Sequence, residues 1–465
     1  MNLRDRIRDV VRQEHARPLN EPVLVPVPFD EAAAPSAPAI ADALCGAFTE
    51  TAAGPCFVVE REYRAGTRHG SMYIGEYAGL MAESAASGEV LAAGLPAGEP
   101  AAPIPWLFFD LETTGLSGGA GTHAFLVGCG FFDGEVFRTR QLFLTGYAVE
   151  RAVLTALTGL LAQTGVLVTF NGKSFDVPVI ETRYLFHRMA LPEAARVHLD
   201  MLHPARQFWR RKRDPRAPVR RDALARWHRD PDGDASDGDR CTLGALERSV
   251  LDFHRQDDVP GSEIPARYFH FVRSGEAGPL EPVFEHNRLD LVSLAALTAR
   301  GLSLVAGGHT AAATARECLA LGRLYERVAR SEPAAACYER SAELSARSIG
   351  APDKHLVWAD ALRRLAKLHR RERRYAEAAT SWEALISTPG CPPAFVAEAT
   401  EALAVHHEHR SRDLAAARRF ARRSVEDSAP AMAREARKRL ARVERKLAAR
   451  AEAGTMLLPA DRDER

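Results

Sequence analysis

The clearest pattern in the chain is an apolar run that ends in two carboxylates. Residues 103–115 read PIPWLFFDLETTG, and an unbroken apolar run of this length predicts a buried strand. Two more predicted strands follow, AFLVGCGFF and EVFRTRQLFL, and the Asp-Gly pair between them indicates a tight hairpin. Helical spacing at 150–163 and 176–189 then alternates with a predicted strand at 166–170. Three meandering strands followed by alternating helices and strands predict a mixed α/β sheet with flanking helices.

The flanking segments divide the chain further. Residues 104–305 form the predicted mixed-sheet domain, and a charged stretch at 206–240 interrupts it, basic at first and then acidic and glycine-rich. This stretch has no apolar period, so we expect an exposed, partly disordered insertion. Before the domain we predict an N-terminal helix with a small irregular segment (1–80), including one strand within 56–78, and a linker rich in Ala, Gly and Pro (81–103).

From residue 311 to residue 450 the pattern is helical and repeats itself, and residues 451–465 form a tail. In each copy a small residue is followed by an aromatic residue or His, then an alanine, then another aromatic residue. The spacing resembles tetratricopeptide repeats, in which small residues let paired helices approach, and it predicts an all-α solenoid able to bind a protein partner. The copies are Gly322/Tyr325/Ala334/Tyr338, Ala366/His369/Ala378/Trp382 and Ala404/His407/Ala416/Phe420. They lie 44 and 38 residues apart, so their helices or loops must be longer than in the usual repeat of about 34 residues.

The composition of the chain says more about its cellular compartment than about its function. The chain has 62 basic and 61 acidic residues for a net charge of +1, a total that neither indicates nor excludes nucleic acid. Its seven cysteines contain no CxxC pair, which argues against a disulfide framework or zinc ribbon and fits a reducing compartment. The charged N-terminus lacks the apolar core of a secretory signal, and no apolar run approaches membrane-spanning length. We therefore expect a cytoplasmic protein with no membrane partner.

The residues that carry chemistry begin with Asp110 and Glu112. Residues two apart on a strand point to the same face, so both carboxylates would converge on one spot. Such a cluster requires a cation, and its oxygen ligands favour Mg²⁺ or Mn²⁺. An Asp-x-Glu pair is common in proteins, so a solvated strand end stays open as the alternative for this motif alone. The context strengthens the metal interpretation, because the pair follows WLFF and precedes Thr113, Thr114 and Gly115.

Two later motifs contain residues that can complete such a site. The segment Asn171-Gly-Lys-Ser-Phe-Asp176 lies after a second predicted buried strand, at the start of a helix. Asp176 could instead cap that helix. His286 and Asp290 are four residues apart on a predicted helix and share a face, although an isolated pair of this kind is usually a surface contact. Asp200, at the end of another predicted strand, can reach the same region, and a structural role is its favoured interpretation.

Together, DLETTG, NxxxFD and a His one helical turn before an Asp resemble the DEDD exonuclease superfamily and, within it, the YprB-like ribonuclease-H-like family. The resemblance covers about residues 104–304. It implies a ribonuclease-H-like sheet and a 3′–5′ exonuclease that hydrolyses phosphodiester bonds of DNA or RNA by a two-metal mechanism. It also implies two Mg²⁺ or Mn²⁺ ions held by Asp110, Glu112, Asp176 and Asp290, with Asp110 bridging both ions and Asp176 acting through water.

His286 is the expected general base, because the pKa of histidine lies near working pH. Its spacing departs from the superfamily, whose His members usually place the His five residues before the Asp, whereas the Tyr members use four. Other motif residues are expected to contact the substrate: Thr113, Thr114, Gly115, Asn171, Lys173 and Phe175. Two alternatives stay open, a catalytically silent nucleic-acid-binding protein and an adaptor built on the helical repeats.

Overall fold

The computed structural model describes most of the chain, with gaps. The described residues are 37–83, 91, 105–115, 121–192, 197–210, 241–348, 354–427 and 433–455. They form two compact units, the first ending at Leu302 and the second beginning at Ser303, and a short segment that starts at Gln207 also belongs to the second unit. The expected N-terminal helix before residue 37, most of the linker and most of the charged insertion lie outside the described residues.

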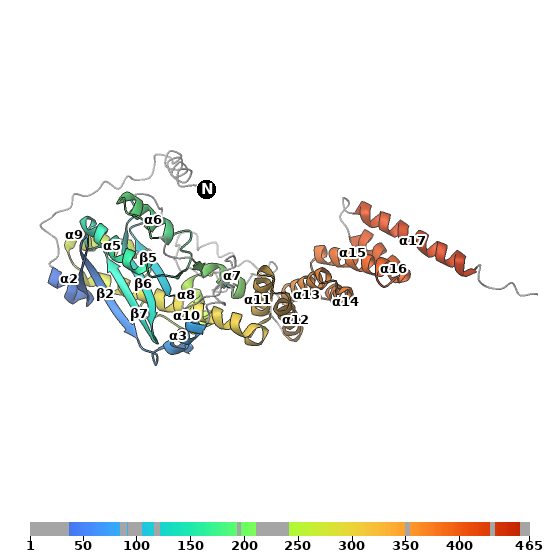
Figure 1. The fold of residues 1–465 in the computed structure, drawn as a ribbon, viewed down its shortest axis with the longest axis horizontal. Helices are drawn as coiled ribbons and strands as arrows, with labels where there is room; N and C mark the ends of the chain where they lie inside the picture. The colour runs from blue at the N-terminus through green and yellow to red at the C-terminus, as the bar shows by residue number, and fades with distance from the viewer. Residues whose placement is uncertain are drawn as a thin grey trace, which may run out of the picture. The chain divides into compact units, whose positions relative to one another are not determined.

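The first unit is built on a mixed seven-stranded sheet with the order β1-β2-β7-β6-β5-β8-β9 (Figure 1). β5 pairs antiparallel with β6 and parallel with β8, and β8 pairs parallel with β9. The predicted mixed sheet is confirmed, and so is the hairpin between β6 and β7, where Gly134 adopts a left-handed backbone (φ 60°). The strands are β1 (Ala47–Thr51), β2 (Gly54–Tyr63), β5 (Trp106–Thr113), β6 (Ala124–Asp133), β7 (Val136–Phe143), β8 (Val166–Thr169) and β9 (Val197–Asp200), and a separate pair is formed by β3 (Arg68–His69) and β4 (Met72–Tyr73).

The N-terminal strands belong to this sheet, which differs from the small irregular segment that the sequence pattern predicts. β2 pairs antiparallel with β7, so that Glu60 lies opposite Arg140 and Glu62 lies opposite Arg138. Both pairs are ion-paired, with 2.5 Å between Arg140 Nε and Glu60 Oε1. Opposite charges that face each other across two strands stabilise the register. The matching alternation in VVEREY and VFRTRQ is the sequence signal for this pairing.

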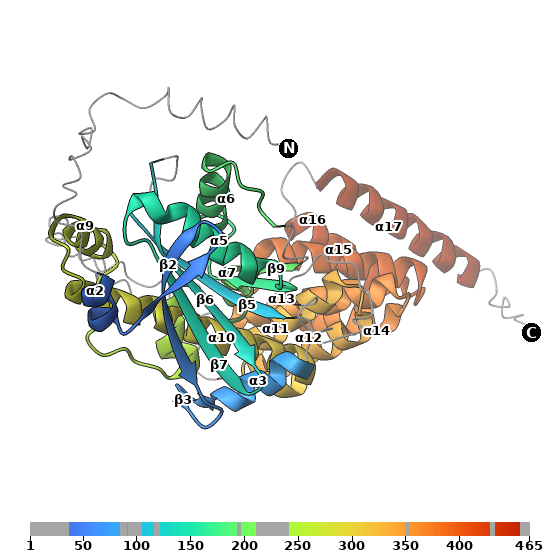
Figure 2. The same ribbon diagram turned by 60° about the vertical axis from the view of Figure 1, so that its left-hand side comes forward.

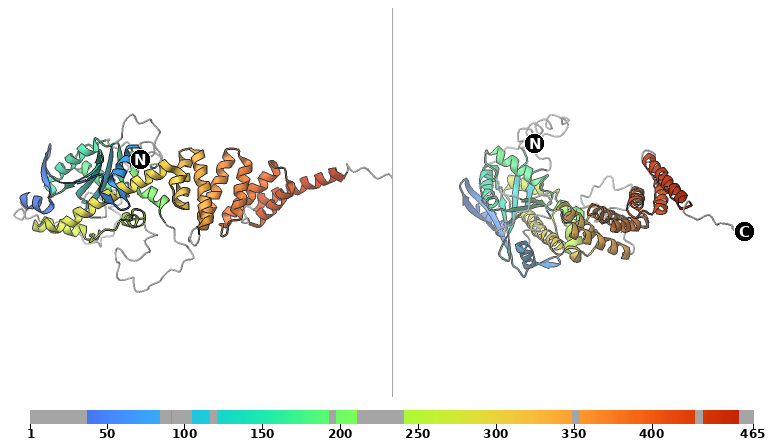
Figure 3. Two further views of the ribbon diagram at one scale, coloured as in Figure 1. Left: turned by 90° about the horizontal axis from the view of Figure 1, so that it is seen from below. Right: turned by 45° about the vertical axis from the view of Figure 1, so that its right-hand side comes forward.

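Helices cover both faces of the sheet (Figures 2 and 3). α5 and α6 pack together on one face, where Tyr184 of α6 donates its hydroxyl to the Leu154 carbonyl of α5 at 2.9 Å. α10 packs on the other face against Gly128, where a Cβ would lie only 2.3 Å from Asn287 Oδ1, so only glycine permits this approach. The α-helices of this part of the chain are α2 (Ala37–Leu44), α3 (Ile74–Glu83), α5 (Glu150–Leu161), α6 (Asp176–Phe186), α7 (Leu202–Phe208), α8 (Leu243–Leu246), α9 (Ile264–Ser274) and α10 (Glu281–Ala311).

α10 corrects one expectation from the sequence. The stretch Gly278–Ala311 is long and apolar enough to cross a membrane by length and composition, with a mean hydropathy of 1.5 in its most apolar window. The prediction that no apolar run of the chain approaches membrane-spanning length is therefore wrong. However, 72% of that window is buried inside the protein, and a buried core helix meets the same criterion. The finding is accordingly weak evidence for a membrane span.

A buried ion cluster joins α5 to α6 and to the start of β6. Glu150 is 3% exposed and accepts from Arg183 at 2.6 and 2.5 Å, from His187 at 2.7 Å and from His123 at 3.2 Å. Burial alone would raise the pKa of Glu150, but the hydrogen bonds from His123, Arg183 and His187 outweigh it and lower the pKa from 4.5 to about 2. The carboxylate therefore stabilises the fold only while it is ionised.

We predict that this cluster sets an acid limit on the first unit. Because the pKa of Glu150 is lowered on folding, its stabilisation is complete above pH 4.5 and is lost as the pH falls toward about 2. Each unit of pKa shift corresponds to about 1.4 kcal/mol. Glu150→Gln should be strongly destabilised at pH 7, and its deficit should shrink as the pH falls. Hydrogen exchange of the α5 and β6 amides measures this, with Glu135→Gln in the exposed hairpin turn as the control. A deficit that does not change with pH would contradict the assignment.

The second unit is a row of helices in which each packs on the next. Gly322, Ala366 and Ala404 lie on the first helix of successive pairs, and the second aromatic residue of each copy lies on the second helix. In the first pair a Cβ on Gly322 would lie 2.4 Å from Tyr338 Cε1, so the small residue does permit the close approach. The helical region is confirmed, whereas kinship with tetratricopeptide repeats stays a prediction. The helices are α11 (Ala315–Arg327), α12 (Ser331–Arg347), α13 (Lys354–Arg371), α14 (Tyr375–Ile386), α15 (Pro393–His409), α16 (Leu414–Asp427) and α17 (Ala433–Thr455).

Candidate active site

The predicted carboxylates gather at one edge of the sheet. β5, β8 and β9 run parallel, so their carboxyl ends lie together. Asp110 and Glu112 lie toward the end of β5, Asp176 begins α6 after β8, and Asp290 arrives from α10. Burial, followed by the charges of Asp290, Glu112 and Asp176, raises the pKa of Asp110 well above its usual value. The four side chains therefore interact electrostatically in one region, as the motifs predict.

A buried amide relay, which the sequence analysis missed, holds Asp110. Asn287 Nδ2 donates to Asp110 Oδ2 at 2.8 Å, and Gln141 Nε2 donates to Asn287 Oδ1 at 2.9 Å. Asn287 and Gln141 are both 0% exposed. A neutral amide supplies a fixed donor, so the relay orients the carboxylate without neutralising it. Asn287 lies inside the predicted helix motif, but its spacing does not indicate which group its amide contacts.

The loop between β8 and α6 is shaped to carry Asp176. Asn171 has a left-handed backbone (φ 67°), and a Cβ on Gly172 would lie 2.8 Å from Asp176 Oδ2. Asp200, at the end of β9, accepts the backbone N–H of Asn171 at 2.7 Å and that of Lys173 at 3.1 Å. These bonds fix the loop, so Asp200 has the structural role that the sequence analysis favoured.

Asp176 lies in the first turn of α6, and its interpretation as the helix cap is wrong. The N-cap residue is Phe175, whose side chain makes no capping bond. Burial and the charges of Asp200 and Asp290 raise the pKa of Asp176 from 3.8 to about 7. Its ionised form is therefore disfavoured until a nearby cation offsets the neighbouring carboxylates.

Asp290 is paired with an arginine that the sequence analysis also missed. Arg255 Nη2 donates to Asp290 Oδ1, while its Nε and Nη2 donate to Glu247 at 2.8 and 2.6 Å. Glu247 is 1% exposed, and the Arg255 side chain is 8% exposed. The two hydrogen bonds from Arg255 to Glu247 fix the guanidinium beside the carboxylates. Neither residue belongs to a motif, and a single Arg or Glu carries no spacing signal.

His286 lies one turn before Asp290 on α10, and Asp258 orients its ring. Asp258 Oδ1 is 2.6 Å from His286 Nδ1, and Asp290 Oδ2 is 3.7 Å from Nε2. Because a carboxylate only accepts, the contact with Asp258 favours a proton on Nδ1, although Arg255 Nη1 also lies 3.3 Å from this atom; the neutral ring would then have its lone pair on Nε2. Burial lowers the pKa of His286, but the hydrogen bond with Asp258 and the charge of Asp290 outweigh it, so the pKa lies above its usual value. His286 is thus part of the carboxylate cluster and not an isolated surface contact.

The side chains gathered at the sheet edge carry oxygen atoms of the kind that bind divalent cations. Among the described residues, no group of three or more His, Cys, Asp or Glu side chains is arranged to hold an ion. Asn287 instead donates to Asp110, and Arg255 to Asp290. Carboxylate oxygens are nevertheless the ligands that Mg²⁺ and Mn²⁺ prefer. Burial and neighbouring carboxylates raise the pKa of Asp110 and of Glu112, and a bound cation would relieve that repulsion. The residue types thus suit the predicted ions, while in this structure Arg255 occupies Asp290 Oδ1.

The residues that are predicted to contact the substrate differ in their hydrogen bonds and in their exposure. Thr113 Oγ1 donates to the Gly115 carbonyl at 3.0 Å, and Thr114 Oγ1 accepts the His123 N–H at 3.0 Å. Both hydroxyls therefore shape the loop after β5. Their contacts with substrate stay predictions, as do those of Gly115, Asn171, the exposed Lys173 and Phe175, which is 52% exposed.

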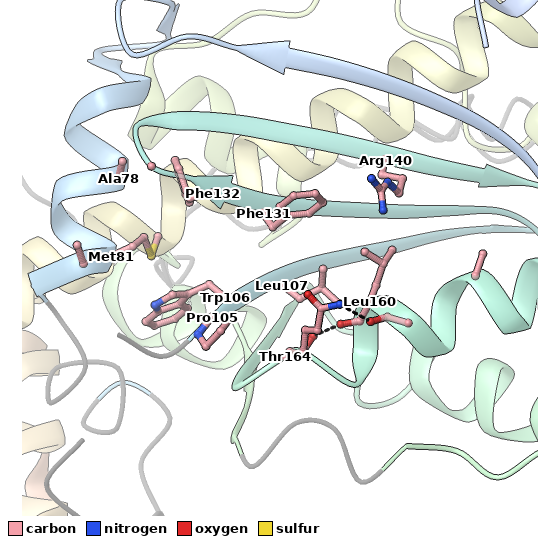
Figure 4. Close-up of a pocket in the computed structure, with 15 residues that line it drawn as sticks. Ala78, Met81, Pro105, Trp106, Leu107, Phe131, Phe132, Arg140, Leu160 and Thr164 are labelled. Atoms are coloured by element: carbon pink, nitrogen blue, oxygen red, sulfur yellow. Dashed lines mark hydrogen bonds between the residues drawn. The ribbon is translucent and has the colours of Figure 1, made fainter. Parts of the chain in front are cut away.

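Figure 4 shows a cavity of about 660 Å³ whose lining includes none of the four carboxylates. It is bounded by Trp106 at the start of β5 and by Phe131 and Phe132 near the hairpin, whereas Asp110 and Glu112 lie further along β5. Its wall is mostly apolar, and its Arg140 is paired with Glu60. This lining contains no Asp, Glu, His or Cys, so this cavity offers no carboxylate, imidazole or thiol side chain for catalysis.

Comparison with known proteins defines the class. Residues 107–300 match the family described as RNase_H superfamily. The matched range includes most of β5, all of α5 and α6, and most of α10. The presence of a domain of this superfamily indicates that the protein is a nuclease, that is, a hydrolase that acts on nucleic acid. Such nucleases usually use divalent metal ions.

A relative extends the match beyond that domain. The chain is 30% identical over 345 residues to "Uncharacterized protein YprB" of Bacillus subtilis (strain 168), which covers 73% of this chain and 74% of that protein. The chain therefore belongs to the YprB family, with a ribonuclease-H-like domain.

We predict that Asp110 destabilises the protein when no metal is bound. Its pKa is raised on folding, so the protein loses stability as the pH rises above the usual value of the group. In EDTA at pH 8, Asp110→Asn should therefore raise the melting temperature by a few degrees. Mn²⁺ should stabilise the native protein and leave the variant unchanged. Glu281→Gln, exposed at the start of α10, is the control. A variant that is less stable in EDTA, or that responds fully to Mn²⁺, would contradict the prediction.

Proposed function

We propose that this protein is a 3′–5′ exonuclease that hydrolyses phosphodiester bonds of DNA or RNA with two Mg²⁺ or Mn²⁺ ions. The observation that supports the proposal is the convergence of four carboxylates with His286 at one sheet edge. Their order and spacing resemble the DEDD motifs, and the RNase_H superfamily match supplies the broader class.

The carboxylates have distinct tasks in this proposal. Asp110, Glu112 and Asp290 would hold one ion, and Asp110 and Asp176 would hold the other, with Asp176 acting through water. Bound ions would activate the attacking water, stabilise charge on the phosphorus oxygens and help the leaving alkoxide depart. Asn287 keeps Asp110 aimed at this position through its 2.8 Å hydrogen bond.

Arg255 has a task of its own, which follows from its anchor. Two hydrogen bonds hold its guanidinium on Glu247, so the side chain would stay beside the site if Asp290 turned toward an ion. The Nη2 N–H that Asp290 accepts in this structure would then be available for a phosphate oxygen, whereas Nη1 lies 3.5 Å from Asp258 Oδ2 and 3.3 Å from His286 Nδ1. Arg255 therefore serves as a built-in cation before the substrate arrives and as a phosphate contact afterwards.

His286 takes the proton of the attacking water through Nε2. Asp258, 2.6 Å from Nδ1, fixes the tautomer and stabilises the imidazolium that forms. Only the neutral ring accepts a proton, so the rate should fall as the pH drops through the pKa of His286. Burial lowers that pKa, but Asp258 and Asp290 raise it further, whereas bound cations would lower it.

The proposal is tested with end-labelled single- and double-stranded DNA and RNA in Mg²⁺, Mn²⁺ or EDTA. We expect metal-dependent shortening from the 3′ end with release of mononucleotides, and none in EDTA. Blocking the 3′ end should stop the reaction. Cleavage inside the strands would overturn the exonuclease assignment, and the absence of any cleavage would favour a silent binding protein.

We predict that His286→Ala retains substrate binding but loses about 10² to 10⁴ in single-turnover rate, the usual contribution of a general base. His286→Tyr should recover part of the rate, because the Tyr members of the DEDD superfamily place a phenol at this four-residue spacing. The variant should also move the pH profile to higher values, because the pKa of a phenol is higher than that of an imidazole. His270→Ala changes an exposed histidine of α9 and is the matched control. A loss of less than about tenfold with an unmoved pH profile would exclude His286 as the base.

A further inference from the structure

The second unit has a groove whose chemistry the nuclease proposal does not use. It has a volume of about 380 Å³ and is formed by α13, α14 and α15. Its floor is apolar, with Trp382 only 2% exposed, and Val405 on its wall is 37% exposed. The lining residues that carry charge or hydrogen-bonding groups are Arg370, Tyr375, Glu398, Glu401, His406 and Arg410.

The acidic groups of the groove are neutralised within the protein. Glu398 is paired with Arg363 at 2.5 Å and with Lys367 at 2.6 Å. Glu401 is paired with Arg439 of α17 at 3.1 Å. Since each carboxylate already has a basic partner, neither attracts a cationic ligand strongly. The charge that the groove offers to a ligand therefore comes from its arginines.

Those arginines differ from the acidic residues in having no carboxylate partner. Both Arg370 and Arg410 are exposed, and among the described residues neither forms an ion pair with Asp or Glu. Arg410 lies over the ring of Tyr375, with 3.9 Å from its Cζ to the ring centroid. The guanidinium is thus held at the rim of the groove while its N–H groups are available, which is the arrangement that favours a carboxylate ligand.

We propose that this groove docks a short acidic segment of a partner protein, with an apolar side chain against the exposed Val405 and carboxylates paired with Arg370 and Arg410. Nucleic acid fits less well. Trp382 is almost fully buried, and Arg410 covers Tyr375, so neither ring offers an open face on which a base can stack. A small apolar pocket beside two cations instead fits an acidic residue next to a leucine, isoleucine or phenylalanine.

The test is selection of displayed random peptides on the full-length chain, followed by affinity measurements with synthetic copies of the enriched peptides. We expect enrichment of Asp or Glu next to an apolar residue. The double variant R370E/R410E should weaken binding by at least about tenfold, a change equivalent to 1.4 kcal/mol. A peptide in which Lys replaces the acidic residues should bind this variant better than it binds the native chain.

The matched control is R418E/R422E, which reverses two exposed arginines of α16 outside the groove lining. It should leave peptide binding unchanged, and circular dichroism should show both double variants to be folded. Three results would overturn the proposal: no acidic enrichment, equal peptide binding by R370E/R410E, or a labelled oligo(dT) whose binding depends on Arg370 and Arg410 and displaces the peptide. Nuclease activity on short oligonucleotides is not part of this readout, so the two proposals fail independently.

Discussion

Repulsion among buried carboxylates is the constraint on which the site depends. Burial and the neighbouring charges raise the pKa of Asp110 and Glu112 well above their usual values, and that of Asp176 to about 7. Such a cluster costs stability in the metal-free protein, and the surrounding structure limits that cost. Arg255 places one positive charge against Asp290, and Asn287 gives Asp110 a hydrogen bond. In the proposed function, bound divalent cations would relieve this repulsion.

The sheet brings these groups together because parallel strands end at a common edge. The approach of α10 depends on Gly128, and the loop that carries Asp176 depends on Gly172, since a Cβ at either position would collide with Asn287 or Asp176. On the opposite face, Glu150 joins α5 to α6 by a buried ion cluster. The two electrostatic arrangements differ. The Glu150 cluster is satisfied internally and stabilises the fold, whereas the carboxylates at the sheet edge repel one another in the region where we propose that ions bind.

Local patterns predicted the elements well, and long-range contacts less well. The apolar run before Asp110 and the hairpin after it gave the sheet, and the small residue at 322 gave the packing of one helix pair. The pairing of β2 with β7 depends on charges some 76 to 80 residues apart in the chain, which a local pattern does not connect. The contact of Arg255 with Asp290 was missed for the same reason, because these residues are 35 positions apart and become neighbours only when the chain folds. The expected domain limits and the roles of the site residues stay predictions.

The central claim is that the carboxylate edge binds divalent cations. The most direct measurement is a crystal structure with Mn²⁺, using anomalous scattering to locate the ions. The account predicts manganese peaks among the carboxylates of Asp110, Glu112, Asp176 and Asp290, with the guanidinium of Arg255 separated from Asp290 and still bonded to Glu247. It would be contradicted by an edge without manganese at saturating concentration while the contact between Arg255 and Asp290 stays intact.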